Sequence, residues 1–169
     1  ERRGYALELA VDFVRMEYTR HRFWEKDDTP VVPLKSQTLE DVIKTWPQGK
    51  INVRIGDYMF RPHQKWTITA VPDGGGYLGG PYYKIVIEGT NRALAATADA
   101  EVVTVPEFTG APEQLWRIDQ LTDGTYRIMP KEVPGTDKEL VLVSVGDSTP
   151  SLGEFNMNSD NSKWNFRDH

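Results

Sequence analysis

The sequence predicts an all-β fold made of three consecutive units of about 50 residues. The first observation is the motif Gln-x-Trp, which occurs as Gln64-x-Trp66 in "PHQKW" and as Gln114-x-Trp116 in "APEQLW". A weaker copy, Ser162-x-Trp164 in "NSKW", extends the series, and the three tryptophans are spaced by 50 and 48 positions. A recurring period of this length indicates a repeat architecture.

The second observation is an element that precedes two of the tryptophans. It occurs as Tyr83-x-Ile85 in "PYYKIVIEG" and as Tyr126-x-Ile128 in "GTYRIMP". Between the tyrosine and the tryptophan, each unit contains short apolar, β-branched runs bounded by Gly, Pro and Asp, such as "AEVVTVPEF" and "ELVLVSV". Each unit is therefore predicted to form about four strands.

The third observation is the joint between two units, "QLWRIDQLTDGTYRIMP", in which the Thr-Asp-Gly turn at 122–124 separates two strand-like runs. Three units of four strands are too few for a propeller, but they can close as a threefold barrel capped by hairpins. The predicted fold is therefore a single β-trefoil domain over residues 1–169, with units at about 1–66, 67–116 and 117–169. We expect the repeated tryptophans to turn inward near the axis.

The first unit is predicted to be enlarged. Tyr5-x-Leu7 in "RGYALELAVDF" is taken as its start, because residues 5–13 alternate between apolar and other residues as a strand does. Residues 6–25 also contain good helix formers at helical spacing, so a helix is the alternative there. The interval from Tyr5 to Trp66 is longer than in the other units, which predicts an insertion of some twenty-odd residues within residues 30–50.

The predicted insertion contains the signals of a short helix in "SQTLEDVIKTWPQG". Ser36 or Thr38 is the candidate N-cap, and Pro47 and Gly49 follow as terminators. Acidic residues stand in the first turn, where they favour a helix N-terminus. The expected architecture is thus a β-trefoil whose first unit carries an insertion with a short helix.

Composition excludes several classes of function. With 38% hydrophobic and 27% charged residues the chain is typical of a folded globular protein. A net charge of −5 gives no broad basic face for nucleic acid, and no apolar run approaches the roughly 18 residues of a membrane span. The absence of cysteine leaves the compartment open, and "ERRGYALEL" without an initiator Met predicts a processed or trimmed chain.

No catalytic, cofactor or metal site is predicted. Gly74-x-Gly76-x-x-Gly79 matches a dinucleotide fingerprint in its letters, but Pro81 and a β-rich run follow where a helix is required, so we interpret it as a hairpin loop. His21, His63 and His169 are far apart and form no zinc-binding pair. Motifs for a catalytic serine or cysteine are also absent.

The segments "HQKWTI", "EQLWRI" and "GTYRI" resemble the ricin-B-like β-trefoil superfamily, over residues 63–169. The resemblance implies that sugar-binding members have an Asp soon after the apolar residues of the second strand, followed by an aromatic residue and an Asn. In "NRALAATAD" the corresponding positions are Ala95 and Ala96, with Asp99 later, and "ELVLVSVGD" has Asp147. This departure argues against sugar binding by the usual geometry.

The short chain, the absence of cysteine and the form of the repeated motifs are more similar to the mushroom β-trefoil protease inhibitors, the cospin-like and mycocypin-like families. The resemblance implies inhibition of proteases by surface loops, with no particular residue carried over. From the residues alone, the rigid extended loop in "TPVVPLKSQ" is the candidate, with Pro33, Leu34, Lys35 and Ser36 as inhibitory residues and Lys35 suited to a trypsin-like pocket. Residues 71–81 and 130–139 form two further long loops.

The predicted function is that of a non-catalytic binding protein without a cofactor. A protease inhibitor is the leading hypothesis, a carbohydrate-binding lectin is the first alternative, and an accessory subunit that docks through residues 1–62 on a larger enzyme is the second. The expected partner is accordingly a protease or a larger subunit, with a glycan as the alternative. The target and the oligomeric state are left open.

Overall fold

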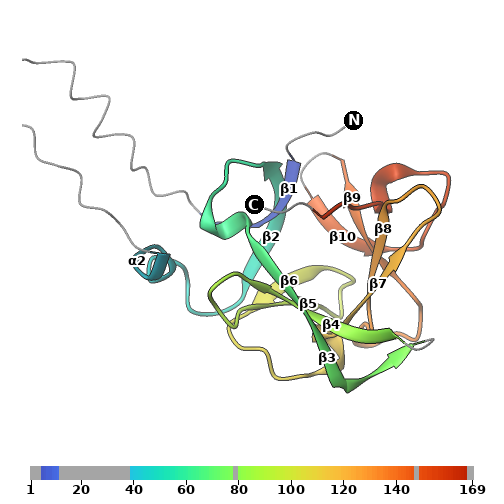
Figure 1. The fold of residues 1–169 in the computed structure, drawn as a ribbon, viewed down its shortest axis with the longest axis horizontal. Coiled ribbons are helices and arrows are strands. Elements are labelled where there is room, and N and C mark those ends of the chain that lie inside the picture. The colour runs from blue at the N-terminus through green and yellow to red at the C-terminus, as the bar shows by residue number, and fades with distance from the viewer. Residues whose placement is uncertain (1–4, 12–38, 78–79, 147–148, 167–169) are drawn as a thin grey trace, which may run out of the picture. The chain divides into compact units, whose positions relative to one another are not determined.

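The computed structural model describes residues 5–11, 39–77, 80–146 and 149–166 (Figure 1). The chain divides into two compact units, one formed by Glu1–Ala10 with Gln48–His169 and the other by Val11–Pro47. The smaller unit contains helix α2, Leu39–Ile43, which confirms the predicted short helix. Glu40 and Asp41 lie in its first turn, where their charges favour the helix N-terminus.

The larger unit consists of strands and three short 3₁₀ helices, each of which ends two residues before a repeated tryptophan. In chain order its elements are β1 Tyr5–Leu9, β2 Ile51–Asp57, η1 Pro62–Gln64, β3 Trp66–Tyr77, β4 Gly80–Ile87, β5 Ala93–Ala96, β6 Val102–Val105, η2 Pro112–Gln114, β7 Trp116–Gln120, β8 Tyr126–Pro130, β9 Val141–Val145, β10 Thr149–Gly153 and η3 Asp160–Ser162. All strand pairs are antiparallel.

The sheets consist of hairpins that form the cap and hairpins that form the barrel. β1 pairs with β2, β5 with β6 and β9 with β10. β3 pairs with β4 and β7 with β8, and the second of these hairpins has the predicted turn, where Gly124 adopts a φ of 90°. β4 also pairs with β7, and Tyr126 at the start of β8 forms an antiparallel bridge with Trp164.

The three tryptophans make the same hydrogen bond in each unit. The indole Nε1 of Trp66 donates to the carbonyl oxygen of Leu7 at 2.8 Å, that of Trp116 to Leu94 at 2.9 Å and that of Trp164 to Leu142 at 3.0 Å. These bonds make β1, β5 and β9 equivalent strands, each followed by the second strand of its hairpin. Three such units form a β-trefoil, as the sequence predicts.

The glutamine of Gln-x-Trp closes the loop before the 3₁₀ helix in the first and second units. The side-chain oxygen of Gln64 accepts a bond from the Met59 N–H, and that of Gln114 accepts from the Thr109 N–H, both at 2.8 Å. In the third unit Ser162 takes this position, and its buried hydroxyl has no hydrogen-bond partner among the described residues. The motif therefore marks an equivalent position in each unit, which closes the loop in the first two.

The three hairpins of the cap meet through β2, β6 and β10. Ile51 pairs with Thr104, whose buried hydroxyl donates to the Ile51 carbonyl oxygen at 3.0 Å. The Leu152 N–H donates to the carbonyl oxygen of Ala100 at 2.9 Å. Of the three repeated tryptophans, Trp116 on β7 is fully buried, and Trp66 and Trp164 are half-buried.

The proposed start of the first unit is also wrong. Because Leu7 makes the bond that Leu94 and Leu142 make, β1 corresponds to β5 and β9, which are the second strands of their units. Tyr5-x-Leu7 is therefore not equivalent to Tyr83-x-Ile85, and a two-residue pattern was too short to separate the two strands. The strand interpretation is correct for residues 5–9, and most of the rest of residues 6–25 lies outside the described part.

This reassignment changes the size and place of the insertion. Leu7 and Trp66 are 59 positions apart, whereas the equivalent bonded pairs in the other units are 22 apart, a difference of 37. The smaller compact unit, Val11–Pro47, contains the same number of residues. The insertion is thus longer than predicted and begins before residue 30, because the misassigned first strand displaced its expected start.

Candidate functional site

The predicted inhibitory residues Pro33, Leu34, Lys35 and Ser36 lie outside the residues that the structure describes, so this loop stays a prediction. The other two long loops are described almost completely. Residues 71–81 belong to the β3–β4 hairpin, with an irregularity between Val71 and Gly76. A strand and not a helix follows the glycines, which agrees with the interpretation of a hairpin loop.

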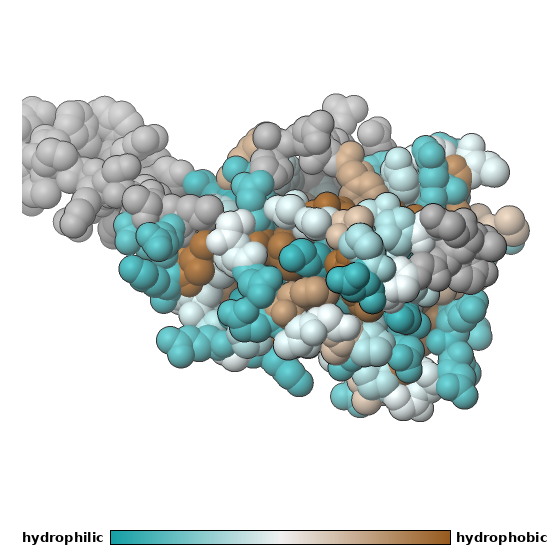
Figure 2. Space-filling model, turned by 60° about the horizontal axis from the view of Figure 1, so that its bottom comes forward, coloured by the Kyte–Doolittle hydropathy of each residue, from teal (hydrophilic) through white to brown (hydrophobic). Residues whose placement is uncertain are grey.

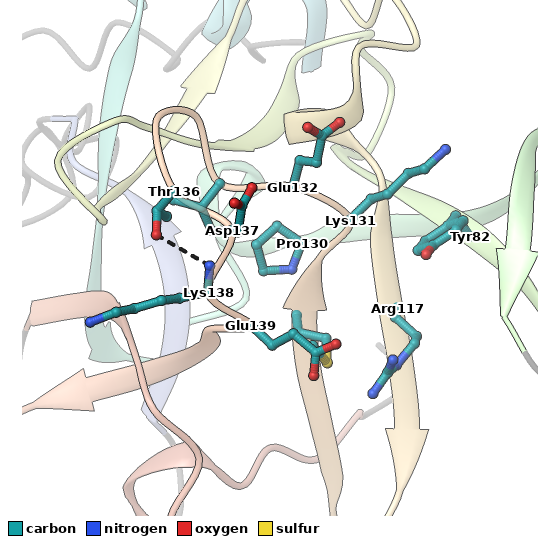
Figure 3. Close-up of a pocket in the computed structure, with 11 residues that line it drawn as sticks. Tyr82, Arg117, Pro130, Lys131, Glu132, Thr136, Asp137, Lys138 and Glu139 are labelled. Atoms are coloured by element: carbon teal, nitrogen blue, oxygen red, sulfur yellow. Dashed lines mark hydrogen bonds between the residues drawn. The ribbon is translucent and has the colours of Figure 1, made fainter.

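Residues 130–139 form one side of a surface pocket of about 270 Å³ (Figure 3). Three elements contribute to it: Tyr82 comes from β4, Arg117 from β7, and the remaining residues from the end of β8 and the loop that follows. The lining residues are Tyr82, Arg117, Met129, Pro130, Lys131, Glu132, Val133, Thr136, Asp137, Lys138 and Glu139.

The loop beside the pocket is held by backbone contacts. The Lys131 N–H donates to the Leu115 carbonyl oxygen at 2.8 Å, which fixes the point where the chain leaves β8. Val133, which is buried, forms an antiparallel bridge with Thr136, and Gly135 between them has a φ of 82° that glycine adopts without strain. A pocket wall with this many local bonds loses little further entropy when a ligand binds.

Charges of both signs surround the pocket, from three basic and three acidic side chains. The Lys131 ammonium lies 5.2 Å from the centre of the Tyr82 ring and donates to the Gly74 carbonyl oxygen at 2.8 Å, which ties the glycine-rich loop to the pocket. In Figure 3 the side chains of Glu132 and Asp137 lie on one side of Pro130, and Arg117 and Glu139 lie on the other. Such a site offers both donors and acceptors to a ligand rich in hydroxyl groups.

Sequence reasoning found only half of this pocket. The sequence predicts residues 130–139 as a long loop. It does not place Tyr82 beside this loop, because the β4–β7 pairing that places Tyr82 next to Arg117 is a long-range contact.

A second polar cluster lies on β1, β2 and η1 around the buried carboxylate of Glu8. Arg54 Nε donates to one carboxylate oxygen at 2.5 Å, Gln64 Nε2 donates to the other at 2.7 Å, and His63 Nε2 lies 3.7 Å away. Burial raises the pKa of Glu8, but the nearby His63 and the hydrogen bonds from Gln64 and Arg54 outweigh it and lower the pKa to about 2.

Glu8 occupies the position at which the resemblance requires a carboxylate. It follows Leu7 as Ala95 follows Leu94 and as Val143 follows Leu142. The sequence pattern does not reveal this position, because Tyr5-x-Leu7 resembles the start of a first strand. The side chain is 5% exposed and its oxygens are already bonded, so its role is to join three elements and not to receive a ligand.

Aromatic residues recur eight or nine positions before the repeated tryptophans, and two of them are covered by cations. Lys84 Nζ lies 5.3 Å from the centre of the Phe108 ring, and Arg127 Cζ lies 4.9 Å from that of Phe155. Lys84 and Arg127 each follow the tyrosine of Tyr-x-Ile, so this contact also repeats. A sugar could stack on these rings only after displacing the cation.

The described residues contain no group of three His, Asp or Glu side chains arranged to hold a metal ion. Within the same residues, no helix has the length and apolar character needed to cross a membrane. The face of the molecule in Figure 2 has hydrophobic residues scattered among hydrophilic ones, which is ordinary for a protein surface.

Comparison with known proteins agrees with the fold. Residues 62–142 match a family model described as a ricin-type beta-trefoil lectin domain-like family. The structure is similar to that of a mosquitocidal holotoxin, with a TM-score of 0.55 and 20% identity over 69% of this chain, and this chain corresponds to 14% of the holotoxin chain. A search of curated proteins gave no match.

ThreeFoil, a designed 3-fold symmetric protein, is also similar, with a TM-score of 0.53 and 23% identity over 70% of this chain and 81% of ThreeFoil. At these identities the two structures establish the β-trefoil fold. The ricin-type lectin-like part of the predicted resemblance is confirmed, and the finer likeness to mushroom protease inhibitors stays a prediction.

Proposed function

We propose that this chain is a non-catalytic carbohydrate-binding domain and that the pocket between β4, β7 and residues 130–139 receives the sugar. The observation that carries the proposal is the match of residues 62–142 to a ricin-type lectin-like family, because this range contains every residue that lines the pocket. The lectin alternative therefore replaces protease inhibition as the leading hypothesis.

The chemistry of the pocket supports a sugar ligand. Exposed carboxylates such as Glu132 and Asp137 accept hydrogen bonds from sugar hydroxyls, and Arg117 and Lys138 donate to ring and hydroxyl oxygens. Tyr82 adds a flat apolar surface at one side of the pocket. The pocket volume of about 270 Å³ suits one small ring better than a large ligand.

A domain of this kind is able to act inside a larger protein. The similarity to a region that makes up 14% of the mosquitocidal holotoxin supports this part of the proposal. In that case the pocket delivers the larger protein to a glycan-bearing surface, and no chemical step takes place in the trefoil itself.

The test is isothermal titration of the full chain with a panel of mono- and disaccharides, followed by the variant Glu132→Ala/Asp137→Ala. We expect saturable binding of at least one sugar, and a loss of about ten-fold or more in affinity in the variant, since two ligand hydrogen bonds disappear. Glu101→Ala, an exposed acidic residue that does not line the pocket, is the matched control and should bind as the wild type does. Binding that both variants retain equally would place the sugar elsewhere.

A further inference from the structure

The chain contains two Asp-Gly pairs, Asp73-Gly74 in the β3–β4 hairpin and Asp123-Gly124 in the β7–β8 turn. At such a pair the backbone nitrogen of the glycine, which no Cβ shields, can attack the side-chain carboxyl carbon of the aspartate. Water leaves as the five-membered succinimide ring closes, and a second water molecule opens the ring at one of its two carbonyl groups. Opening at the main-chain carbonyl yields isoaspartate, in which the main chain continues through the former side-chain carboxyl group.

The structure protects Asp123 from this reaction. Its carboxylate accepts hydrogen bonds from the Thr125 N–H at 3.0 Å and from the Thr125 hydroxyl at 2.6 Å, and it pairs with the Lys163 ammonium at 3.2 Å. The attacking group, the Gly124 N–H, donates to the Leu121 carbonyl oxygen at 3.0 Å. The bonds from Thr125, followed by Lys163, also lower the pKa of Asp123 to about 2. The protonated carboxyl group, from which water leaves most readily, is therefore rarer than in an ordinary aspartate.

Asp73 lies in a different environment. The regular pairing of β3 with β4 is interrupted between Val71 and Gly76, so residues 72–75 have no partner on β4. The Asp73 side chain is exposed, and within the described part of the chain it makes no hydrogen bond or ion pair. The backbone after it is a run of glycines, in which Gly75 has a φ of 91° that glycine adopts without strain. The carboxyl group of Asp73 is thus free to approach the next backbone nitrogen.

A change at Asp73 reaches the pocket through Gly74. The Gly74 carbonyl oxygen accepts the hydrogen bond from the Lys131 ammonium at 2.8 Å, and that ammonium lies 5.2 Å from the centre of the Tyr82 ring. Gly74 also packs closely on Leu115, since a Cβ at position 74 would lie 3.0 Å from Leu115 Cδ1. Isoaspartate adds one carbon atom to the main chain before Gly74, so the carbonyl group cannot keep its place in so tight a contact. Lys131 then loses its partner on the glycine-rich loop.

We infer that Asp73-Gly74 is a site of spontaneous covalent modification, where the aspartate converts to isoaspartate and releases Lys131 from the glycine-rich loop. The reaction consumes no reagent, because the water that leaves on ring closure is replaced by the water that opens the ring. The conversion moves the negative charge of Asp73 from the side chain to a carboxylate on the main-chain α-carbon. A resulting change in sugar affinity rests on the proposed function, whereas the conversion itself does not.

The test is storage of the full chain at pH 7, with samples taken over time, digested with trypsin and analysed by liquid chromatography and mass spectrometry. Peptide 66–84 has Asp73 as its only acidic residue, and peptide 118–127 contains Asp119 and Asp123, which fragment ions separate. We expect isoaspartate to form at least about ten-fold faster at Asp73 than at Asp123. In the chain unfolded with guanidinium chloride the two rates should converge, since the contacts of Asp123 are lost. A smaller ratio in the folded protein, or no conversion in peptide 66–84, would overturn the proposal.

Two variants separate the causes of the difference. Asp73→Glu keeps the charge on an exposed side chain but should abolish the conversion in peptide 66–84, because the longer side chain closes a ring much more slowly. Thr125→Ala removes the hydroxyl bond to Asp123 and should raise the rate at Asp123 at least about three-fold, with the rate at Asp73 unchanged. An unchanged rate at Asp123 would contradict the protection by its contacts.

The release of Lys131 is measured by trace acetylation of lysines before and after conversion. Labelling of Lys131 should rise at least about two-fold once its bond to Gly74 is lost. Lys138, which also lines the pocket, is the internal control and should not change, and Asp73→Glu stored in the same way should show no rise at either lysine. Equal labelling of Lys131 in the converted and unconverted protein would contradict the release. No sugar takes part, so failure here is separate from failure of the proposed function.

Discussion

Glu8 is a charged residue that the first unit uses to join three of its elements. Its carboxylate connects β1 to Arg54 on β2 and to Gln64 at the end of η1. Gly56 on β2 pairs with Ala6 on β1 and leaves room for the Glu8 carboxylate. A Cβ atom at position 56 would lie 2.7 Å from Glu8 Oε1. A buried carboxylate is stable in a fold only when bonds of this kind replace its hydration.

The lowered pKa of Glu8 makes the stability of the fold depend on pH. Because the pKa falls from 4.5 to about 2 on folding, the stabilisation is complete above pH 4.5 and is lost as pH falls through about 2. The shift corresponds to about 3 kcal/mol. We expect urea unfolding to show a fall of this order between pH 5 and pH 2 that is largely missing in Glu8→Gln, which is less stable than the wild type at pH 7. Parallel pH profiles for the two proteins would contradict this role.

The position two residues before each repeated tryptophan is equivalent in the three units, but its hydrogen bonds differ between them. Gln64 bonds to the backbone of Met59 and Asp57 and to the Glu8 carboxylate. Gln114 bonds to Thr109 through N–H and hydroxyl groups, and Ser162 has no partner among the described residues. Equivalent positions therefore contribute unequally to stability.

These unequal bonds predict that alanine variants at the three positions lower the free energy of unfolding by different amounts. Gln64→Ala should cost about 3 kcal/mol because it removes a partner of a buried charge, and Gln114→Ala about 1 kcal/mol because it removes bonds to a loop that water reaches. Ser162→Ala should change the free energy of unfolding by less than about 0.5 kcal/mol, since no bond is lost. Urea denaturation of the three variants measures the order, and a Ser162→Ala as costly as Gln64→Ala would contradict it.

At the same scale, the sequence predicts elements whose signal is local. The Thr-Asp-Gly turn, the short helix before Pro47 and the strands near each Gln-x-Trp are read from neighbouring residues, and the structure has all of them. The place of β1 in its unit is not local, because only the bond from Trp66 to Leu7 identifies it. The pocket was missed for the same reason, as strand pairing and not spacing brings Tyr82 to Arg117.

For the whole molecule, the two hypotheses of function fall in different segments of the chain. The trefoil and its pocket are formed by residues outside Val11–Pro47, while the predicted inhibitory residues, among them Lys35, fall inside that range. A glycan-binding site and a protease-inhibiting loop are thus able to exist in the same chain without sharing a residue.

Deleting residues 11–47 tests this separation. Leu9 pairs with Val53, and after the deletion six residues would connect them, close to the five that connect the paired Ala96 and Val102 in the second unit. We expect the variant to keep cooperative thermal unfolding by circular dichroism and to keep the sugar affinity of the full chain, because the turn has a length that the fold already uses. Inhibition of trypsin, if titration of the full chain detects it, should disappear in this variant and in Lys35→Ala alike. Loss of cooperative unfolding would instead show that the inserted segment is part of the same folding unit, as the predicted single domain requires.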